Sequence, residues 1–195
     1  MDELTDFLPG RVNLTLTLSS YLFLIITIIT AILYLTDSKM LMGVNIWLKP
    51  LKFSISIFIF LFTSAYIVPQ LPYQTSKQSI IVWVLIFTMI IEIACIIFQA
   101  YRGQQSHFNI TDPIGRKLFP LMGIMISVAY FTYFIILIDF FRLNTSLSPA
   151  MLWAVRFGII ILLFGGISGF MMASGLKHNV GVADGGVGLP FTNWS

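Results

Sequence analysis

The chain has 195 residues, a formal net charge of +3 and a mean hydropathy of +0.92. Hydrophobic residues make up 57% and charged residues only 10%, against roughly 45–50% and about 25% in a typical soluble protein. Too few charges remain to cover a water-facing surface, so the composition excludes a soluble enzyme, a disordered chain and a nucleic-acid-binding protein. The single cysteine, Cys95, excludes a disulfide scaffold.

Five apolar stretches reach the length needed to span a membrane. They cover approximately residues 14–35, 53–68, 79–101, 118–141 and 149–174. Backbone polar groups in lipid must be satisfied within the chain, and no stretch alternates like a barrel strand, so all five predict helices. A start of the second helix at Leu48 places Pro50 in its first turn. We therefore predict one membrane domain, an all-α integral membrane protein with a bundle of five transmembrane helices and a Gly-rich C-terminal tail.

Positive charges near the helix ends predict the orientation. With five spans, one side of the membrane carries three basic residues: Arg11, Lys77 and Arg142. The other side carries seven: Lys39, Lys49, Lys52, Arg102, Arg116, Lys117 and Lys177. The excess predicts a multi-pass protein of the cell inner membrane, with its N-terminus outside and its C-terminus in the cytoplasm. Residues 40–47, between the first two spans, are expected to form a short interfacial segment.

Glu92, near the middle of the third span, is the most informative polar residue of the spans. A charged side chain at this depth costs about 2.5–3.5 kcal/mol, so a protein keeps one for a reason. Helical spacing aligns Glu92 with Cys95, Gln99, Arg102 and, further along, Ser106. This stripe indicates either a proton or ligand path or one wall of a polar cavity. The alternative is a structural carboxyl that is protonated, or hydrogen-bonded to a neighbouring Ser, Thr or Tyr.

Other features of the spans favour structural roles. Asp139 in the fourth helix and Arg156 in the fifth are expected to pair, because the short loop between these helices makes them antiparallel neighbours. Gly165, Gly169 and Ala173 form a stripe of small residues at every fourth position. Such a stripe is typical of close helix packing, within the bundle or across a dimer.

Three polar segments fall on the predicted cytoplasmic side: residues 47–53, residues 99–109 and the tail, residues 175–195. They contain both histidines of the chain. We interpret the segments as the walls of one ligand-binding site, with the following candidate residues: Lys49, Lys52, Gln99, Arg102, Ser106, His107, Asn109, His178 and Asp184.

Several chemistries suit this set. His107 and His178 could bind a metal ion or supply both axial ligands of a haem, although the ligand spacings of a zinc site are absent. His107 could act as an acid or base with Asp112 or Asp184. The basic residues could hold lipid phosphates. An ordinary positive-inside bias with interfacial aromatic anchors would also account for these segments.

The tail is rich in glycine but also carries Leu189, Pro190, Phe191 and Trp194. Residues 185–188 lack the flanking strand, the following helix and the Lys-Ser/Thr pair of a phosphate-binding loop, which excludes that motif. The apolar residues predict that the tail packs back onto the helix ends.

Three motifs stand out in the polar segments. They are Lys49-Pro50-Leu51-Lys52-Phe53; Gln99 with Arg102-Gly103 and Ser106-His107-Phe108-Asn109; and His178, Gly181, Asp184-Gly185-Gly186, Gly188-Leu189-Pro190 and Trp194-Ser195. In these motifs the chain resembles an uncharacterised family of bacterial polytopic membrane proteins. The resemblance implies membrane class and no particular activity. Members of that family continue into another His-containing helix, which implies that this chain is a short member, a processed product or a truncated form.

Our leading hypothesis is a non-enzymatic membrane subunit or binding protein. Its polar site would hold a ligand, a lipid headgroup or a partner, either a second membrane subunit or another copy of the chain. The first alternative is a haem or quinone redox protein that uses His107 and His178. The second is a proton-coupled transporter that uses Glu92, although the chain lacks the matching halves of an inverted-repeat transporter.

Overall fold

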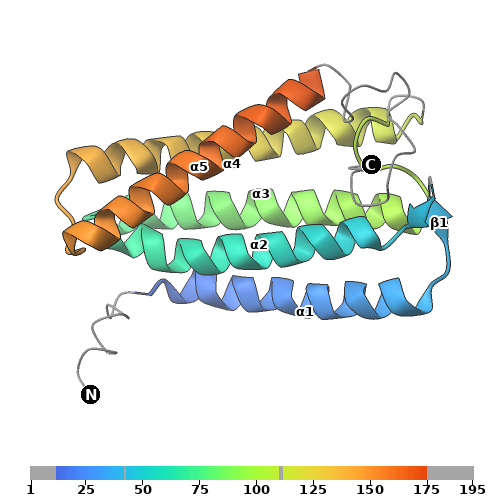
Figure 1. Cartoon of the computed structure of the whole chain (residues 1–195), viewed down its shortest axis with the longest axis horizontal. Helices are drawn as coiled ribbons and strands as arrows, with labels where there is room; N and C mark the ends of the chain where they lie inside the picture. Colours follow the sequence, from blue (N-terminus) through green and yellow to red (C-terminus); the bar gives the residue numbers. More distant parts are fainter. Residues whose placement is uncertain (1–11, 42, 110–111, 175–195) are drawn as a thin grey trace.

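The computed structural model describes residues 12–41, 43–109 and 112–174 (Figure 1). Within them, five long helices form the bundle: α1 (Leu14–Thr36), α2 (Leu48–Ile67), α3 (Thr75–Tyr101), α4 (Gly115–Arg142) and α5 (Pro149–Ser174). A short 3-10 helix, η1 (Val68–Gln70), extends α2. All five helices are long and apolar enough to cross a membrane. The predicted all-α bundle is confirmed, and the chain is a multi-pass membrane protein.

The helix boundaries follow local chemistry. α1 begins after Asn13, whose side chain accepts a hydrogen bond from the backbone N–H of Leu16. α2 begins at Leu48, with Pro50 in its first turn, where an N–H has no helical partner. Pro69 lies in η1, so the helical path continues past the predicted end of the second span.

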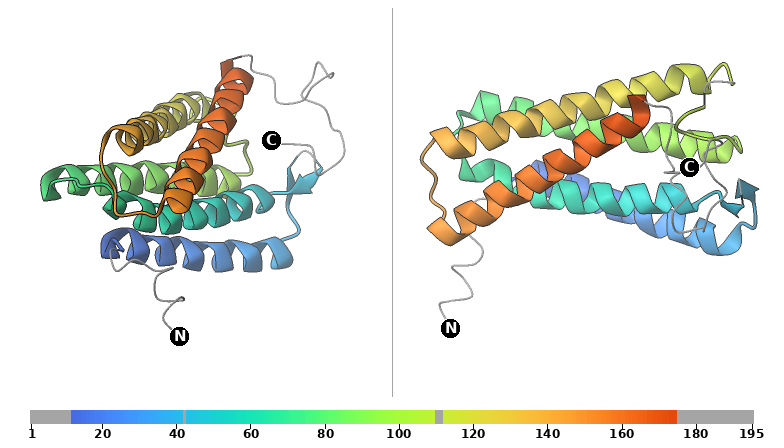
Figure 2. Two further views of the ribbon diagram at one scale, coloured as in Figure 1. Left: turned by 60° about the vertical axis from the view of Figure 1, so that its left-hand side comes forward. Right: turned by 45° about the horizontal axis from the view of Figure 1, so that its top comes forward.

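Neighbours in sequence are also neighbours in space: α1 packs on α2, α2 on α3, α3 on α4, and α4 on α5. Figure 1 shows α1 and α2 side by side, whereas α5 crosses the bundle obliquely. The second panel of Figure 2 shows the same crossing from another direction. The oblique path means that the two halves of α5 have different neighbours.

The main core runs along the bundle and includes the fully buried Leu61, Leu85 and Ile136. Buried hydroxyl groups within it are hydrogen-bonded, as where Thr30 of α1 meets Ser54 of α2 at 3.2 Å. The outer faces of the helices carry many large apolar side chains that are exposed. This distribution suits helices whose outer surface is in contact with lipid.

The expected interfacial segment after α1 is a small hairpin of two strands, β1 (Met40–Leu41) and β2 (Val44–Asn45). Trp47 Nε1 donates to Asp37 Oδ2 at 2.9 Å, which ties the end of the hairpin back to the end of α1. This hydrogen bond lowers the pKa of Asp37. We call this end of the bundle, with residues 37–47 and 102–114, the hairpin end. The opposite end, with residues 71–74 and 143–148, is the far end.

Candidate functional site

A cavity of about 450 Å³ lies at the hairpin end of the bundle, between α2, α3, α4 and α5. Its wall is mostly apolar and includes five aromatic rings: Phe53, Phe108, Phe119, Tyr130 and Phe170. Besides Tyr130, four ionisable side chains line it: Lys49, Lys52, Glu92 and His107. The volume falls within the range of roughly 300–1,000 Å³ that is usual for small-molecule sites. The cavity therefore has the size and lining of a ligand site.

Glu92 of α3 places a carboxylate in this cavity. Its side chain is only 5% exposed, and Oε1 lies 3.5 Å from Nε2 of His107. The other oxygen, Oε2, is buried without a hydrogen-bond partner in the part of the chain that the structure describes. The ammonium group of Lys49 acts electrostatically on this carboxylate. An unpaired carboxylate oxygen on a residue that lines a cavity is unusual, because buried polar atoms in proteins are nearly always hydrogen-bonded.

His107 is held on both of its ring nitrogens. Nε2 faces Glu92, and Nδ1 lies 3.1 Å from Ser106 Oγ. A proton on Nε2 leaves Nδ1 to accept from the hydroxyl of Ser106, so one neutral tautomer suits both contacts. Burial lowers the pKa of His107, and the contact with Glu92 only partly opposes this effect. The imidazole is therefore neutral near pH 7.

Phe108, the next residue, has a left-handed backbone with φ 58°. This conformation is unusual for a bulky side chain and concentrates at functional sites. Its ring centroid lies 5.1 Å from that of Phe119, while the ring of His107 lies 6.0 Å from Phe119. The strained backbone thus places an aromatic ring in the cavity wall.

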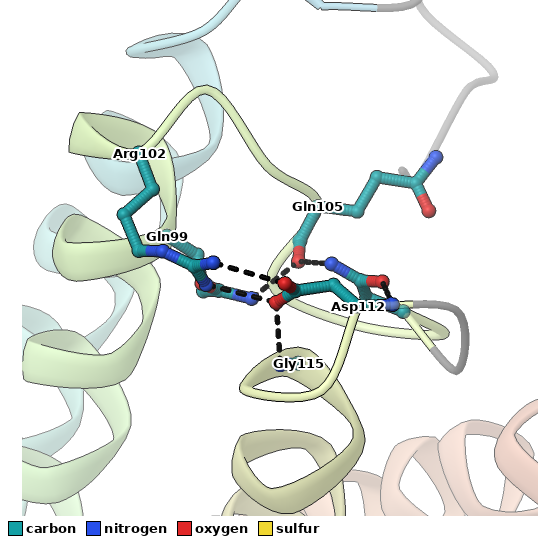
Figure 3. Close-up of polar contacts among 6 residues, drawn as sticks. Gln99, Arg102, Gln105, Asp112 and Gly115 are labelled. Atoms are coloured by element: carbon teal, nitrogen blue, oxygen red, sulfur yellow. Dashed lines mark hydrogen bonds and ion pairs between the residues drawn. The ribbon is translucent and has the colours of Figure 1, made fainter.

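Arg102 and Asp112 join the end of α3 to the start of α4 (Figure 3). Nη1 and Nη2 of Arg102 donate to the two carboxylate oxygens of Asp112, at 2.9 Å each. Nη1 also donates to Gln99 Oε1 at 2.6 Å, and the backbone N–H of Gly115 donates to Asp112 Oδ2 at 2.7 Å. The hydrogen bonds from Arg102 and Gly115 lower the pKa of Asp112 to about 2. This network fixes the loop that carries His107.

Asn109 completes the loop network. Its Nδ2 donates to the carbonyl oxygen of Gln105 at 3.2 Å, and its Oδ1 accepts from the backbone N–H of Asp112 at 3.1 Å. A Cβ atom at Gly115 would lie 2.5 Å from Asn109 Cγ, so only glycine fits at the start of α4.

The predicted ligand-binding residues therefore divide into two groups. Lys49, Lys52, Ser106 and His107 line the cavity. Gln99, Arg102 and Asn109 lie outside the described cavity wall and bind one another and the loop backbone. Their role in the structure is to support the loop.

The predicted pairing of Asp139 with Arg156 is wrong. In the described part of the chain, Asp139 Oδ2 instead accepts from the hydroxyl of Tyr73 and from the ammonium of Lys77, at 2.7 Å each. Arg156 donates from Nε and Nη2 to the carbonyl oxygen of Phe140, at 3.1 and 2.7 Å. The last carbonyl groups of a helix have no helical partner, so the last turn of α4 offers the guanidinium an acceptor.

The predicted packing of Gly165 and Gly169 within the bundle is also wrong. A Cβ atom at either position would have no described atom within 4 Å outside its own helix segment. The close approach is at Gly166, where a Cβ would lie 2.6 Å from the ring of Tyr130. Gly169 and Ala173 line the cavity instead. Helix packing across a dimer through this stripe stays a prediction.

The tail, with His178 and Asp184, lies outside the described residues. Its packing on the helix ends and a haem or metal site at His107 and His178 therefore stay predictions. Among residues 12–41, 43–109 and 112–174, no group of three or more His, Cys, Asp or Glu side chains is placed to hold a metal ion.

The contact between Glu92 and His107 was missed by sequence reasoning, which continued the helical stripe past residue 101. The chain instead reverses at Gly103, with φ 72°. The N–H of Gln104 returns to the carbonyl of Gln99 at 2.9 Å. A glycine directly after a helical pattern is the usual signal for such a C-terminal cap, and it marks where the chain turns back toward α3.

No family model, curated protein or solved structure matches the chain. The family resemblance stays a prediction, and function is inferred from the cavity and its polar groups.

Proposed function

We propose that the protein is a membrane-embedded binding protein whose cavity takes a lipophilic small molecule. One observation carries this proposal. A cavity of about 450 Å³ with a largely apolar wall contains a buried carboxylate oxygen, Oε2 of Glu92, with no hydrogen-bond partner among the described residues. A polar group on a bound molecule would supply that partner, while its apolar part would fill the remaining space.

We place the hairpin end at the cytoplasmic face of the cell inner membrane. The excess of basic residues on this side of the sequence, seven against three, supports the assignment. In this orientation the loop network and the hairpin face the cytoplasm, and Glu92 lies deeper, within α3.

Proton-coupled transport is a second candidate, favoured by the chain of contacts from Glu92 to the loop. Glu92 Oε1 faces His107 Nε2 at 3.5 Å, and His107 Nδ1 faces Ser106 Oγ at 3.1 Å. Such a series of groups suits proton movement between a buried carboxylate and the surface. A pH-dependent flux into proteoliposomes that is lost in Glu92→Gln would distinguish transport from binding alone.

Two glycines of α5 give a matched test of the binding function. An added side chain has open space at both Gly165 and Gly169, but only Gly169 lines the cavity. Leucine also suits a helix better than glycine does at either position. Gly169→Leu therefore places a large side chain in the cavity, and Gly165→Leu is its control.

The measurement is native mass spectrometry of the full chain, extracted gently from its own membrane. We expect the same bound small molecule on the wild type and on Gly165→Leu, and at least about a tenfold lower occupancy on Gly169→Leu, because its side chain takes the ligand's place. Equal occupancy in all three proteins, or no bound molecule on the wild type, would contradict the binding function.

A further inference from the structure

The charges of the cavity constrain the headgroup of its occupant. Lys49 and Glu92 both line the cavity and attract each other, so their formal charges cancel. Lys52 also lines the cavity but lies at an exposed position near the start of α2. A headgroup that binds beside the unpaired oxygen of Glu92 meets a carboxylate if it is anionic, and the nearby ammonium of Lys49 if it is cationic. Both encounters are repulsive inside a largely apolar cavity.

A neutral hydroxyl group satisfies both side chains. An O–H group donates one hydrogen bond and accepts others. It can donate to Glu92 Oε2, the oxygen that has no described partner, and accept from an ammonium group such as that of Lys49. His107 adds no competing charge, because burial keeps its imidazole neutral near pH 7.

The walls of the cavity favour a ring beside this hydroxyl. Aromatic side chains reach the cavity from α2, from the loop at 102–114, from α4 and from α5. Two pairs among them already lie at aromatic packing distances, Phe108 with Phe119 at 5.1 Å and Tyr130 with Phe170 at 5.3 Å. Aliphatic wall residues, including Ile96, Met122 and Ile126, leave an apolar region for a tail.

We propose that the cavity binds a neutral hydroxylated ring with an apolar tail, of the phenol or quinol class, whose O–H donates to Oε2 of Glu92. This inference rests on the proposed binding function and names the class of its ligand. It makes Oε2 of Glu92, which has no partner among the described residues, the determinant of specificity.

Three probes test the class. 4-Nonylphenol carries the hydroxyl, 4-nonylanisole replaces its hydrogen with a methyl group, and dodecyl phosphate carries an anionic headgroup on a similar tail. Each is titrated onto the full chain in phosphatidylcholine nanodiscs, and bound probe is counted by native mass spectrometry. A hydrogen bond to a charged acceptor predicts that wild type binds the phenol roughly ten- to a hundredfold more tightly than the anisole.

Glu92→Gln and Asp139→Asn form the matched pair of variants. Both neutralise a carboxylate within a span, but only Glu92 lines the cavity. We expect Glu92→Gln to reduce the preference for phenol over anisole to within about threefold, because its neutral amide is a weaker acceptor. Asp139→Asn is expected to keep the preference. The comparison of phenol with anisole on the wild type tests the proposal even if Glu92→Gln fails to fold.

The outcomes separate the ligand class from the binding function. Tightest binding of dodecyl phosphate would refute the neutral hydroxyl and indicate an anionic ligand, while the binding function would stand. Equal binding of phenol and anisole, both reduced by Gly169→Leu, would refute the role of Glu92 and leave a cavity that selects by shape. No saturable binding of any probe, together with no native bound molecule, would refute both proposals.

Discussion

Two carboxylates within the membrane-spanning helices, Glu92 near the hairpin end and Asp139 near the far end, have opposite surroundings. Asp139 Oδ2 accepts hydrogen bonds from Tyr73 and Lys77, at 2.7 Å each. Glu92 has one long contact, to His107, and one buried oxygen without a described partner. The depth of a carboxylate in the membrane therefore does not identify its role. Its hydrogen-bond partners do, because a carboxylate that accepts strong hydrogen bonds within the chain stabilises the fold, whereas one that lacks them can bind another molecule.

Both situations also occur close to the hairpin end itself. Its strongest ion pair, Arg102 with Asp112, lies outside the cavity wall and fixes the loop. Glu92, whose Oε2 has no partner among the described residues, lines the cavity from an earlier turn of α3. The ion pair of Arg102 with Asp112 thus fixes the loop, and the loop places His107 beside Glu92.

Removal of the loop pair should give the largest effect. Arg102→Ala removes the guanidinium donors from Asp112 and Gln99, so we expect the apparent melting temperature to fall by about 5 °C. Binding at the cavity should weaken as well, because the same loop carries His107. Thermal unfolding in detergent measures this change, with the exposed Lys117→Ala as control. An Arg102→Ala protein as stable as this control would contradict the role assigned to the pair.

Neutralising Asp139 should lower the apparent melting temperature, whereas neutralising Glu92 should not. Asp139→Asn weakens the contacts with Tyr73 and Lys77, so its apparent melting temperature should fall by about 2–4 °C. Glu92→Gln replaces a buried carboxylate whose Oε2 has no partner among the described residues, so the melting temperature should stay the same or rise. Equal losses in the two variants would remove the distinction between the two carboxylates.

The smallest expected effect is on the pH dependence of stability. Burial holds the pKa of folded His107 below its ordinary value of about 6.5, so the unfolded chain binds this proton more readily. The resulting stabilisation is complete above about pH 6.5 and declines as the pH falls below that value. We expect the apparent melting temperature to drop by roughly 1–3 °C between pH 7.5 and 5.5. His107→Gln should reduce the drop, and an unchanged drop would contradict this origin.

The bundle could be predicted from the sequence because membrane thickness sets the length of each apolar stretch. Glu92 and His107 could each be singled out for their residue type. Their contact could not, because it depends on where the chain reverses after α3, near Gly103. The partner of Asp139 was missed for a related reason. Several cations lie near it in sequence or topology, and the packing of α3 against α4 selects Lys77.

The two halves of α5 have different roles in the structure. Val155, Ile159 and Leu163 belong to the main core, whereas Gly166, Gly169, Phe170 and Ala173 line the cavity. Substitutions in the second half can therefore change the volume of the cavity while the core contacts of the first half are kept. In the course of evolution, such a helix would allow related proteins to bind ligands of different size while they keep the same fold.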